Sequence, residues 1–207
     1  MKSFLRIVLA VTLLSTSLPA FAADAPAKAE ETKDKIDLPA FPADATIKQV
    51  THVAGKTLNY TATVGSLPVR DDKGKKIAEV VFTAYVLDGP RAPKRPITFA
   101  FNGGPGAASV YLNLGAIGPK RIQFGAQGDS ASDPAALIDN PGTWLDFTDM
   151  VFIDPVGTGY SRSLVDEAET KKAFFQVKAD VEYLSRIVFD WLVMSTRWLR
   201  SRYISVC

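Results

Sequence analysis

The sequence has 207 residues, and its 24 Lys and Arg nearly balance its 22 Asp and Glu. A chain this close to neutral has no basic surface for nucleic acid or for an anionic membrane, so we expect neither as a partner. The one cysteine, Cys207, excludes a disulfide within the chain. The fold must therefore depend on a packed hydrophobic core.

The first 22 residues have the organisation of a secretory signal peptide. Lys2 and Arg6 make a positive start, the apolar run 7–14 follows, and Ala20-Phe21-Ala22 has small residues at both ends of a cleavage site. The apolar run is much shorter than the ~20 residues that a membrane-spanning helix needs. We therefore predict cleavage after Ala22, export to the periplasm or the extracellular space, and no membrane association after cleavage.

A flexible leader followed by a single domain is predicted for the rest of the chain. Residues 23–46 are rich in Ala, Lys, Glu, Asp and Pro, which predicts a flexible leader. Residues 47–207 predict one domain. Within it, residues 57–64 alternate in polarity, residues 76–87 are rich in Val, Phe and Tyr, and residues 71–74 between them have turn chemistry. This pattern predicts an antiparallel hairpin.

Two short, almost wholly apolar runs predict strands that are buried on both faces. They are residues 96–101 and 150–154, and a loop rich in Gly and Pro ends each of them. Between the two runs we predict a short helix over 107–114 and a loop over 125–141.

The clearest helix prediction covers residues 167–194. Apolar residues recur there at spacings of three and four, which predicts one packed stripe. The stripe consists of Val177, Val181, Leu184, Val188, Trp191 and Leu192. Residues 203–206 predict the beginning of a further strand. Strand, helix and strand in this order predict an α/β fold in which an N-terminal antiparallel hairpin leads into a mostly parallel sheet.

The loop from Asn102 to Gly106 has the sequence Asn-Gly-Gly-Pro-Gly. Without side chains to cover it, such a backbone turns sharply and lets a substrate approach its N–H groups. In open α/β sheets, ligands bind at the carboxyl ends of the strands. N–H donors in that position stabilise the negative oxygen that develops in acyl transfer. A tight turn that binds no ligand is the alternative interpretation.

The second loop, from Asp154 to Ser161, also follows a buried strand, so we expect it on the same rim of the sheet. Its two glycines, Gly157 and Gly159, do not complete the GxGxxG pattern because position 162 is Arg. The chain also has no GxxxxGK sequence. We therefore expect no nucleotide site here.

Together, the two loops resemble the serine carboxypeptidases, which have the α/β-hydrolase fold. The resemblance extends from about Ile97 to Ser163 and is carried by motifs in the family's order and spacing. These motifs are Asn-Gly-Gly-Pro-Gly at 102–106, Gly118-Pro119, Asn140-Pro141 with Trp144, and the loop 155–161.

The resemblance implies roles for three residues. Asn102 and Gly103 would hold the terminal carboxylate of a peptide substrate, and Gly104 would lend its backbone N–H to the oxyanion hole. Tyr160-Ser161 would line the cleft without an assigned role. The implied activity is hydrolysis of C-terminal peptide bonds through an acyl-serine intermediate, with no cofactor.

Two departures from the family matter. The family usually has an acid two residues before the Gly-Pro pair, where this chain has Ala116, so a preference for free C-termini is in doubt. The family's Gly-Glu-Ser-Tyr-Gly nucleophile turn, with the acid and histidine that follow it in this fold, does not occur within the 207 residues. The expectation is a truncated N-terminal part that is inactive and poorly stable. An esterase or acyltransferase of the same fold and a non-catalytic exported binding protein stay open as alternatives.

Other residues with reactive side chains fit structural interpretations better. The single histidine, His52, lies before the first clear strand, and Ser109 and Ser161 lack a Gly-x-Ser-x-Gly setting. Cys207 has no fixed base beside it at the end of the chain. No His, Cys and carboxylate cluster has the spacing of a metal site, so we expect no metal.

Overall fold

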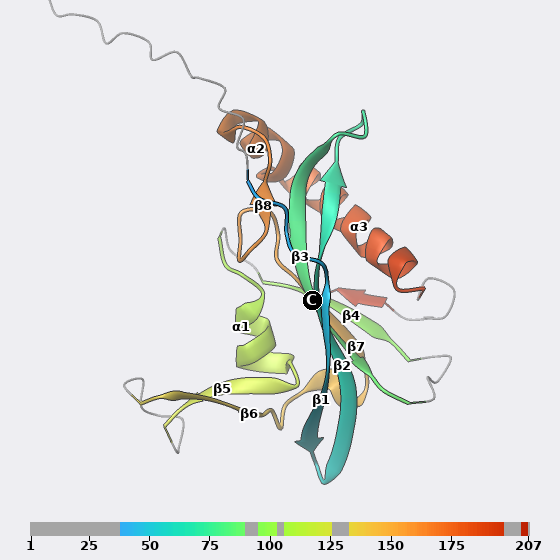
Figure 1. Ribbon diagram of the computed structural model, residues 1–207, viewed down its shortest axis with the longest axis vertical. Coiled ribbons are helices and arrows are strands. Elements are labelled where there is room, and N and C mark those ends of the chain that lie inside the picture. Colours follow the sequence, from blue (N-terminus) through green and yellow to red (C-terminus); the bar gives the residue numbers. More distant parts are fainter. Residues whose placement is uncertain (1–37, 90–94, 103–105, 126–132, 197–203, 207) are drawn as a thin grey trace, which may run out of the picture. The chain divides into compact units, whose positions relative to one another are not determined.

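The computed structural model describes residues 38–89, 95–102, 106–125, 133–196 and 204–206 (Figure 1). All of them belong to the unit Asp34–Cys207. The predicted signal peptide, most of the predicted leader, Gly103, Gly104 and Cys207 lie outside the described residues.

Three long strands form an antiparallel meander at the start of the described chain: β1 Ala45–Val53, β2 Lys56–Arg70 and β3 Lys76–Leu87. Ala54 and Gly55 join β1 to β2 with φ values of 50° and 76°. Two residues at positive φ are typical of a type I′ hairpin turn. The predicted hairpin is confirmed as β2 and β3, and the first two residues of β1 fall within the predicted leader.

Two buried strands lie beside this meander. β7, Asp149–Ile153, pairs antiparallel with β3 and parallel with β4, Ile97–Phe101. β9, Ile204–Val206, pairs parallel with the other side of β4. Among the described residues these strands follow the order β1-β2-β3-β7-β4-β9, and the short β8, Arg162–Ser163, also pairs with β3.

The described sheet is therefore mixed: its N-terminal strands are antiparallel, as predicted, and they lead into the parallel strands β7, β4 and β9. Tight turns connect β1, β2 and β3, and such turns permit only antiparallel neighbours. Parallel neighbours need a crossover of a dozen or more residues. Long connections of this kind separate β4 from β7 and β7 from β9 in the sequence, and parallel pairing is confined to β7, β4 and β9.

The segment between β4 and β7 contains more regular structure than predicted. The short helix α1, Val110–Leu112, continues into the π-helical turn η1, Asn113–Ile117. β5, Lys120–Phe124, pairs antiparallel with β6, Ala135–Asp139, and the 3-10 turn η2, Trp144–Asp146, follows.

The prediction of a loop over 125–141 is therefore wrong where β6 lies. Five residues bounded by prolines show too little periodicity to be recognised as a strand. Their extended form depends on partners across the hairpin. Ile122 lies opposite Leu137, and Lys120 forms an ion pair with Asp139.

The single helix predicted over 167–194 is two helices, α2 Glu167–Phe174 and α3 Val177–Met194. The Asp166 carboxylate caps α2 by accepting a hydrogen bond from the Glu169 N–H at 2.8 Å. The break lets Phe174 pack edge-on against Tyr183, with 5.2 Å between the ring centroids. This tertiary contact is invisible to a local periodicity. No described helix is long and apolar enough to cross a membrane.

Helix α3 packs on the sheet mainly through its second half. Trp191 contacts the rings of Phe99 and Phe82 edge-on, at 5.5 and 6.4 Å between centroids. Val177 and Val181, the first members of the predicted stripe, are instead 86% and 61% exposed. The stripe prediction is wrong for these two residues, and Val177 in the first turn of α3 lines a pocket.

The strand β7 is buried on both faces, as predicted for its apolar run. Val151 and Ile153 belong to the core beneath α3, and Met150 and Phe152 belong to a second core on the opposite face. The alternation follows from the period of two in a strand. Because β7 and β4 are fixed from both sides, the loops that follow them start from rigid positions.

Candidate active site

The two glycine-containing loops leave the same edge of the sheet. β4 and β7 are parallel neighbours, and the last residue of each, Phe101 and Ile153, are register partners. Asn102 and Asp154 therefore begin their loops side by side, which confirms the expectation of a common rim. Gly103 and Gly104 lie outside the described residues, so their assigned roles stay predictions.

Ser109 connects the ends of these two strands. Its hydroxyl accepts a hydrogen bond from the Asn102 N–H at 3.2 Å and donates one to the carbonyl oxygen of Ile153. Its own N–H donates to the Asp154 carboxylate at 2.7 Å. The residue is 1% exposed, so these contacts are made away from water. Ser109 is thus a structural residue, as the sequence indicates.

The second loop is held closed by its own polar groups. Both the N–H and the hydroxyl of Thr158 donate to the Pro155 carbonyl oxygen, at 3.0 and 2.9 Å. The Ser161 hydroxyl donates to the Asp154 carbonyl oxygen at 2.6 Å and accepts from the Val81 N–H at 2.7 Å. Gly159 has a φ of 51°, and a Cβ there would overlap with the Asp154 carboxylate. Glycine is required at this position by backbone shape.

A pocket of about 630 Å³ lies where both loops meet the start of α3. Asn102 and Gly106 line it from the first loop, and residues 155–158 line it from the second. The remaining wall comes from Phe174, Phe175, Gln176, Val177, Asp180 and Tyr183. The expected contribution of Tyr160 is absent from this described lining, and its side chain is 81% exposed.

Tyr183 forms the floor between this pocket and the core. Its hydroxyl accepts a hydrogen bond from the Val156 N–H at 3.2 Å, which ties α3 to the second loop. Burial raises the pKa of this hydroxyl, and the neighbouring Asp180 carboxylate raises it further. The phenol therefore stays protonated across the physiological pH range and acts as a fixed dipole, not as a base.

The family-like motif around Asn140 has a structural role that its sequence did not reveal. The buried Asn140 amide donates to the carbonyl oxygens of Ala116 and Gly118, at 2.7 and 2.8 Å. The Thr143 hydroxyl donates to the Ile117 carbonyl oxygen at 3.2 Å. The backbone at Ala116, where the family usually has an acid, is therefore rigidly held although the acid is replaced.

His52 lies on β1 and forms a structural pair with a carboxylate. Its Nδ1 is 2.8 Å from the Asp139 carboxylate, which also accepts the His52 N–H at 3.2 Å. Hydrogen bonds from Lys120 and then His52 lower the pKa of Asp139 well below its usual range, against the opposing effect of burial. The pair ties β1 to β6.

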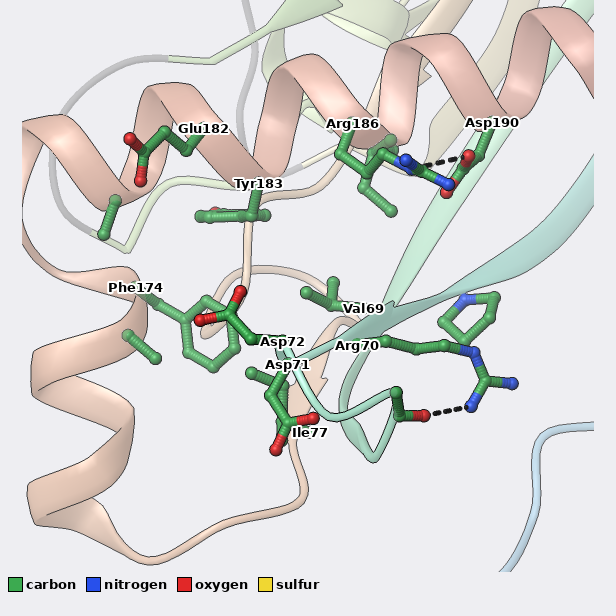
Figure 2. A pocket seen from close by; sticks show the side chains of 15 residues that line it. Val69, Arg70, Asp71, Asp72, Ile77, Phe174, Glu182, Tyr183, Arg186 and Asp190 are labelled. Atoms are coloured by element: carbon green, nitrogen blue, oxygen red, sulfur yellow. Dashed lines mark hydrogen bonds and ion pairs between the residues drawn. The ribbon is translucent and has the colours of Figure 1, made fainter.

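A larger pocket of about 700 Å³ lies between the β2–β3 turn and the helices α2 and α3 (Figure 2). Phe174 and Tyr183 line both pockets. Around its opening, Arg186 pairs with Asp190 at 2.9 Å and Arg70 donates to the Gly74 carbonyl oxygen at 2.9 Å. No described residue of either glycine-containing loop lines it, so we do not assign the candidate active site to it. Within the described ranges, no cluster of three or more His, Cys, Asp or Glu side chains has an arrangement that would hold a metal ion.

Comparison with known families agrees with the two-loop geometry. Residues 56–192 match the family model of the serine carboxypeptidases. The match covers more than half of the chain and includes both loops, β4, β7 and most of α3. The chain therefore belongs to the serine carboxypeptidase family.

Similar curated proteins include pheromone-processing carboxypeptidases of fungi. The chain is 41% identical to that of Sclerotinia sclerotiorum over 71 residues, which are 34% of this chain and 10% of the relative. It is 32% identical to that of Coprinopsis cinerea over 114 residues, 52% of this chain and 18% of the relative. The chain thus spans less than a fifth of the length of these relatives.

Proposed function

We propose that the protein is a serine-type carboxypeptidase of the α/β-hydrolase fold, which releases C-terminal residues from peptides through an acyl-serine intermediate. In this proposal Asn102 and Gly103 hold the substrate's terminal carboxylate, and the Gly104 N–H stabilises the oxyanion. The observation that carries the proposal is the meeting of Asn102 with the second loop at one pocket, on the carboxyl edge of two parallel strands.

In this proposal, the nucleophilic serine and its base are not among the residues that the structure describes. In this fold the nucleophile sits on a sharp turn between a strand and a helix. β9 pairs with β4 up to the partners Phe99 and Val206, and β4 continues for two further residues. A turn that began shortly after β9 would therefore emerge at the level of Asn102.

The test is an assay of the protein at its natural length. We expect release of the C-terminal amino acid from N-blocked dipeptides, and loss of that activity after treatment with a fluorophosphonate. Asn102→Ala is expected to raise KM about tenfold or more for a free-carboxylate substrate, because hydrogen bonds to a charged group are worth about 1.5–3 kcal/mol. The proposal would be refuted if the protein had no peptidase activity, or if its activity persisted after fluorophosphonate treatment.

Esterase activity on the same fold is the second candidate, favoured by Ala116 at the family's acid position. Matched substrates that differ only in a peptide or an ester bond decide between the two. A carboxypeptidase should prefer the peptide with a free C-terminus over the same peptide amidated. An esterase should hydrolyse the ester and show no preference for the free carboxylate.

Export is part of the proposal, since residues 1–22 have signal-peptide organisation. N-terminal sequencing of the protein from the exported fraction is expected to begin at Ala23. Recovery of exported protein that still begins with Met1 would contradict cleavage at this site.

A further inference from the structure

Polar atoms of Ser109 and Asp154 connect the regions that follow β4 and β7. Ser109 precedes helix α1 and Asp154 begins the second loop, 45 positions later in the sequence, yet the Ser109 N–H reaches the Asp154 carboxylate at 2.7 Å. The Ser109 hydroxyl reaches the Asn102 N–H at 3.2 Å and the Ile153 carbonyl oxygen. Three hydrogen bonds therefore connect the ends of β4 and β7 through a single buried residue.

Ser109 links three described positions around the ends of β4 and β7. It precedes helix α1 and accepts a hydrogen bond from the N–H of Asn102, the residue that follows β4. Its own N–H connects it to Asp154 at the start of the second loop. The same carboxylate abuts Gly159, which has no room for a Cβ, so Asp154 is itself held between the two loops.

We propose that Ser109 and Asp154 are positioning residues that hold Asn102 in the orientation needed to bind the substrate's terminal carboxylate. The role in substrate binding rests on the proposed function. The positions of the three residues rest on the hydrogen bonds described above. The Asn102 backbone N–H is engaged by Ser109, which sets the direction of the residue at the end of β4. Binding of a charged group through hydrogen bonds is sensitive to such direction.

The first arm of the test uses the 207-residue chain and amide hydrogen exchange. In the unmodified chain, slow exchange is expected at the N–H groups of Asn102 and Ser109. Ser109→Ala is expected to speed exchange at Asn102 about tenfold or more, because the acceptor is removed. Asp154→Ala should act on the Ser109 N–H in the same way, while Asp154→Asn, which keeps an acceptor oxygen, should change it much less.

The second arm uses the complete protein and a pair of peptide substrates, one with a free C-terminal carboxylate and one amidated. Ser109→Ala and Asp154→Ala are expected to raise KM about tenfold for the free carboxylate and to leave KM for the amide nearly unchanged. A loss of general stability would affect both substrates alike. Asp154→Asn should restore most of the preference.

Ser163→Ala is the matched control. Its hydroxyl bonds to Thr170 at 2.6 Å, just beyond the second loop, and connects neither loop to the other. It should leave the substrate preference and the Asn102 exchange rate unchanged.

The outcomes separate the two proposals. If the complete unmodified protein has no peptidase activity, the proposed function fails, and the exchange arm still decides the geometry. If the protein is active but Ser109→Ala and Asp154→Ala keep the preference for the free carboxylate, the positioning inference is overturned. Fast exchange at Asn102 in the unmodified chain would overturn it as well.

Discussion

A fluorophosphonate probe is expected to leave Ser109 and Ser161 of the purified 207-residue chain unmodified. A nucleophilic serine needs an exposed hydroxyl and a base that takes its proton. Each of these hydroxyls is buried, donates to a backbone carbonyl oxygen and accepts from a backbone N–H. The one histidine, His52, is bonded to Asp139 on another part of the sheet. Intact-mass spectrometry should show no adduct, and the chain alone should release no amino acid from peptides.

A known serine hydrolase in the same reaction serves as the positive control for the probe. The protein at its natural length is the informative comparison, since the proposed function predicts one adduct on it at a serine other than these two. Stoichiometric labelling of Ser109 or Ser161, mapped by peptide mass spectrometry, would overturn both the structural role of that serine and the assignment of the nucleophile elsewhere.

Arg162→Ala is expected to lower the free energy of unfolding by about 3 kcal/mol at pH 7. The Arg162 guanidinium donates twice to the Glu79 carboxylate, at 2.9 and 2.6 Å, and lies 3.9 Å over the Phe41 ring. Glu79 is only 5% exposed, so the substitution leaves a buried carboxylate that keeps its ion pair with Lys76 and loses the Arg162 guanidinium. Removing one partner of a buried ion pair typically costs about 3–5 kcal/mol. Urea unfolding monitored by tryptophan fluorescence measures the difference.

The cost should shrink as the pH falls. Burial by itself raises the pKa of Glu79, but hydrogen bonds from Lys76 and Arg162 outweigh burial and lower this pKa below its usual value. The ion pair's contribution is therefore complete above the unfolded pKa of about 4.3 and is lost as the pH falls through the lower folded value. Without Arg162, burial favours protonated Glu79. Glu79 of the variant therefore takes up its proton at a higher pH than in the unmodified protein, and this removes the cost of the buried charge. The two should differ less at pH 4 than at pH 7.

Lys171→Ala provides the matched control for this prediction. Lys171 pairs with Glu167 on the surface of α2, where both side chains are largely exposed. Exposed pairs of this kind contribute about 0.3–0.5 kcal/mol. An equal loss for Lys171→Ala and Arg162→Ala, or a loss for Arg162→Ala that does not depend on pH, would contradict the assigned role of Glu79.

Local sequence signals identified the features that depend on short-range chemistry. Apolar runs at 96–101 and 150–154 predicted β4 and β7, because a strand buried on both faces needs apolar residues at every position. The glycines of the two loops predicted sharp turns after these strands. The order of the elements predicted that both loops leave the same rim of the sheet, and the parallel pairing of β4 with β7 confirms it.

Only tertiary structure decided the features that depend on distant partners. β6 is a strand because it pairs with β5, the break between α2 and α3 lets Phe174 reach Tyr183, and β3 pairs antiparallel with β7 across more than sixty residues. Ser109 and Asp154 carry no recognisable sequence signal, since a buried serine and a strand-end aspartate are common. Their bridge exists because parallel pairing of β4 and β7 brings two loop ends within hydrogen-bonding distance, which no local pattern encodes.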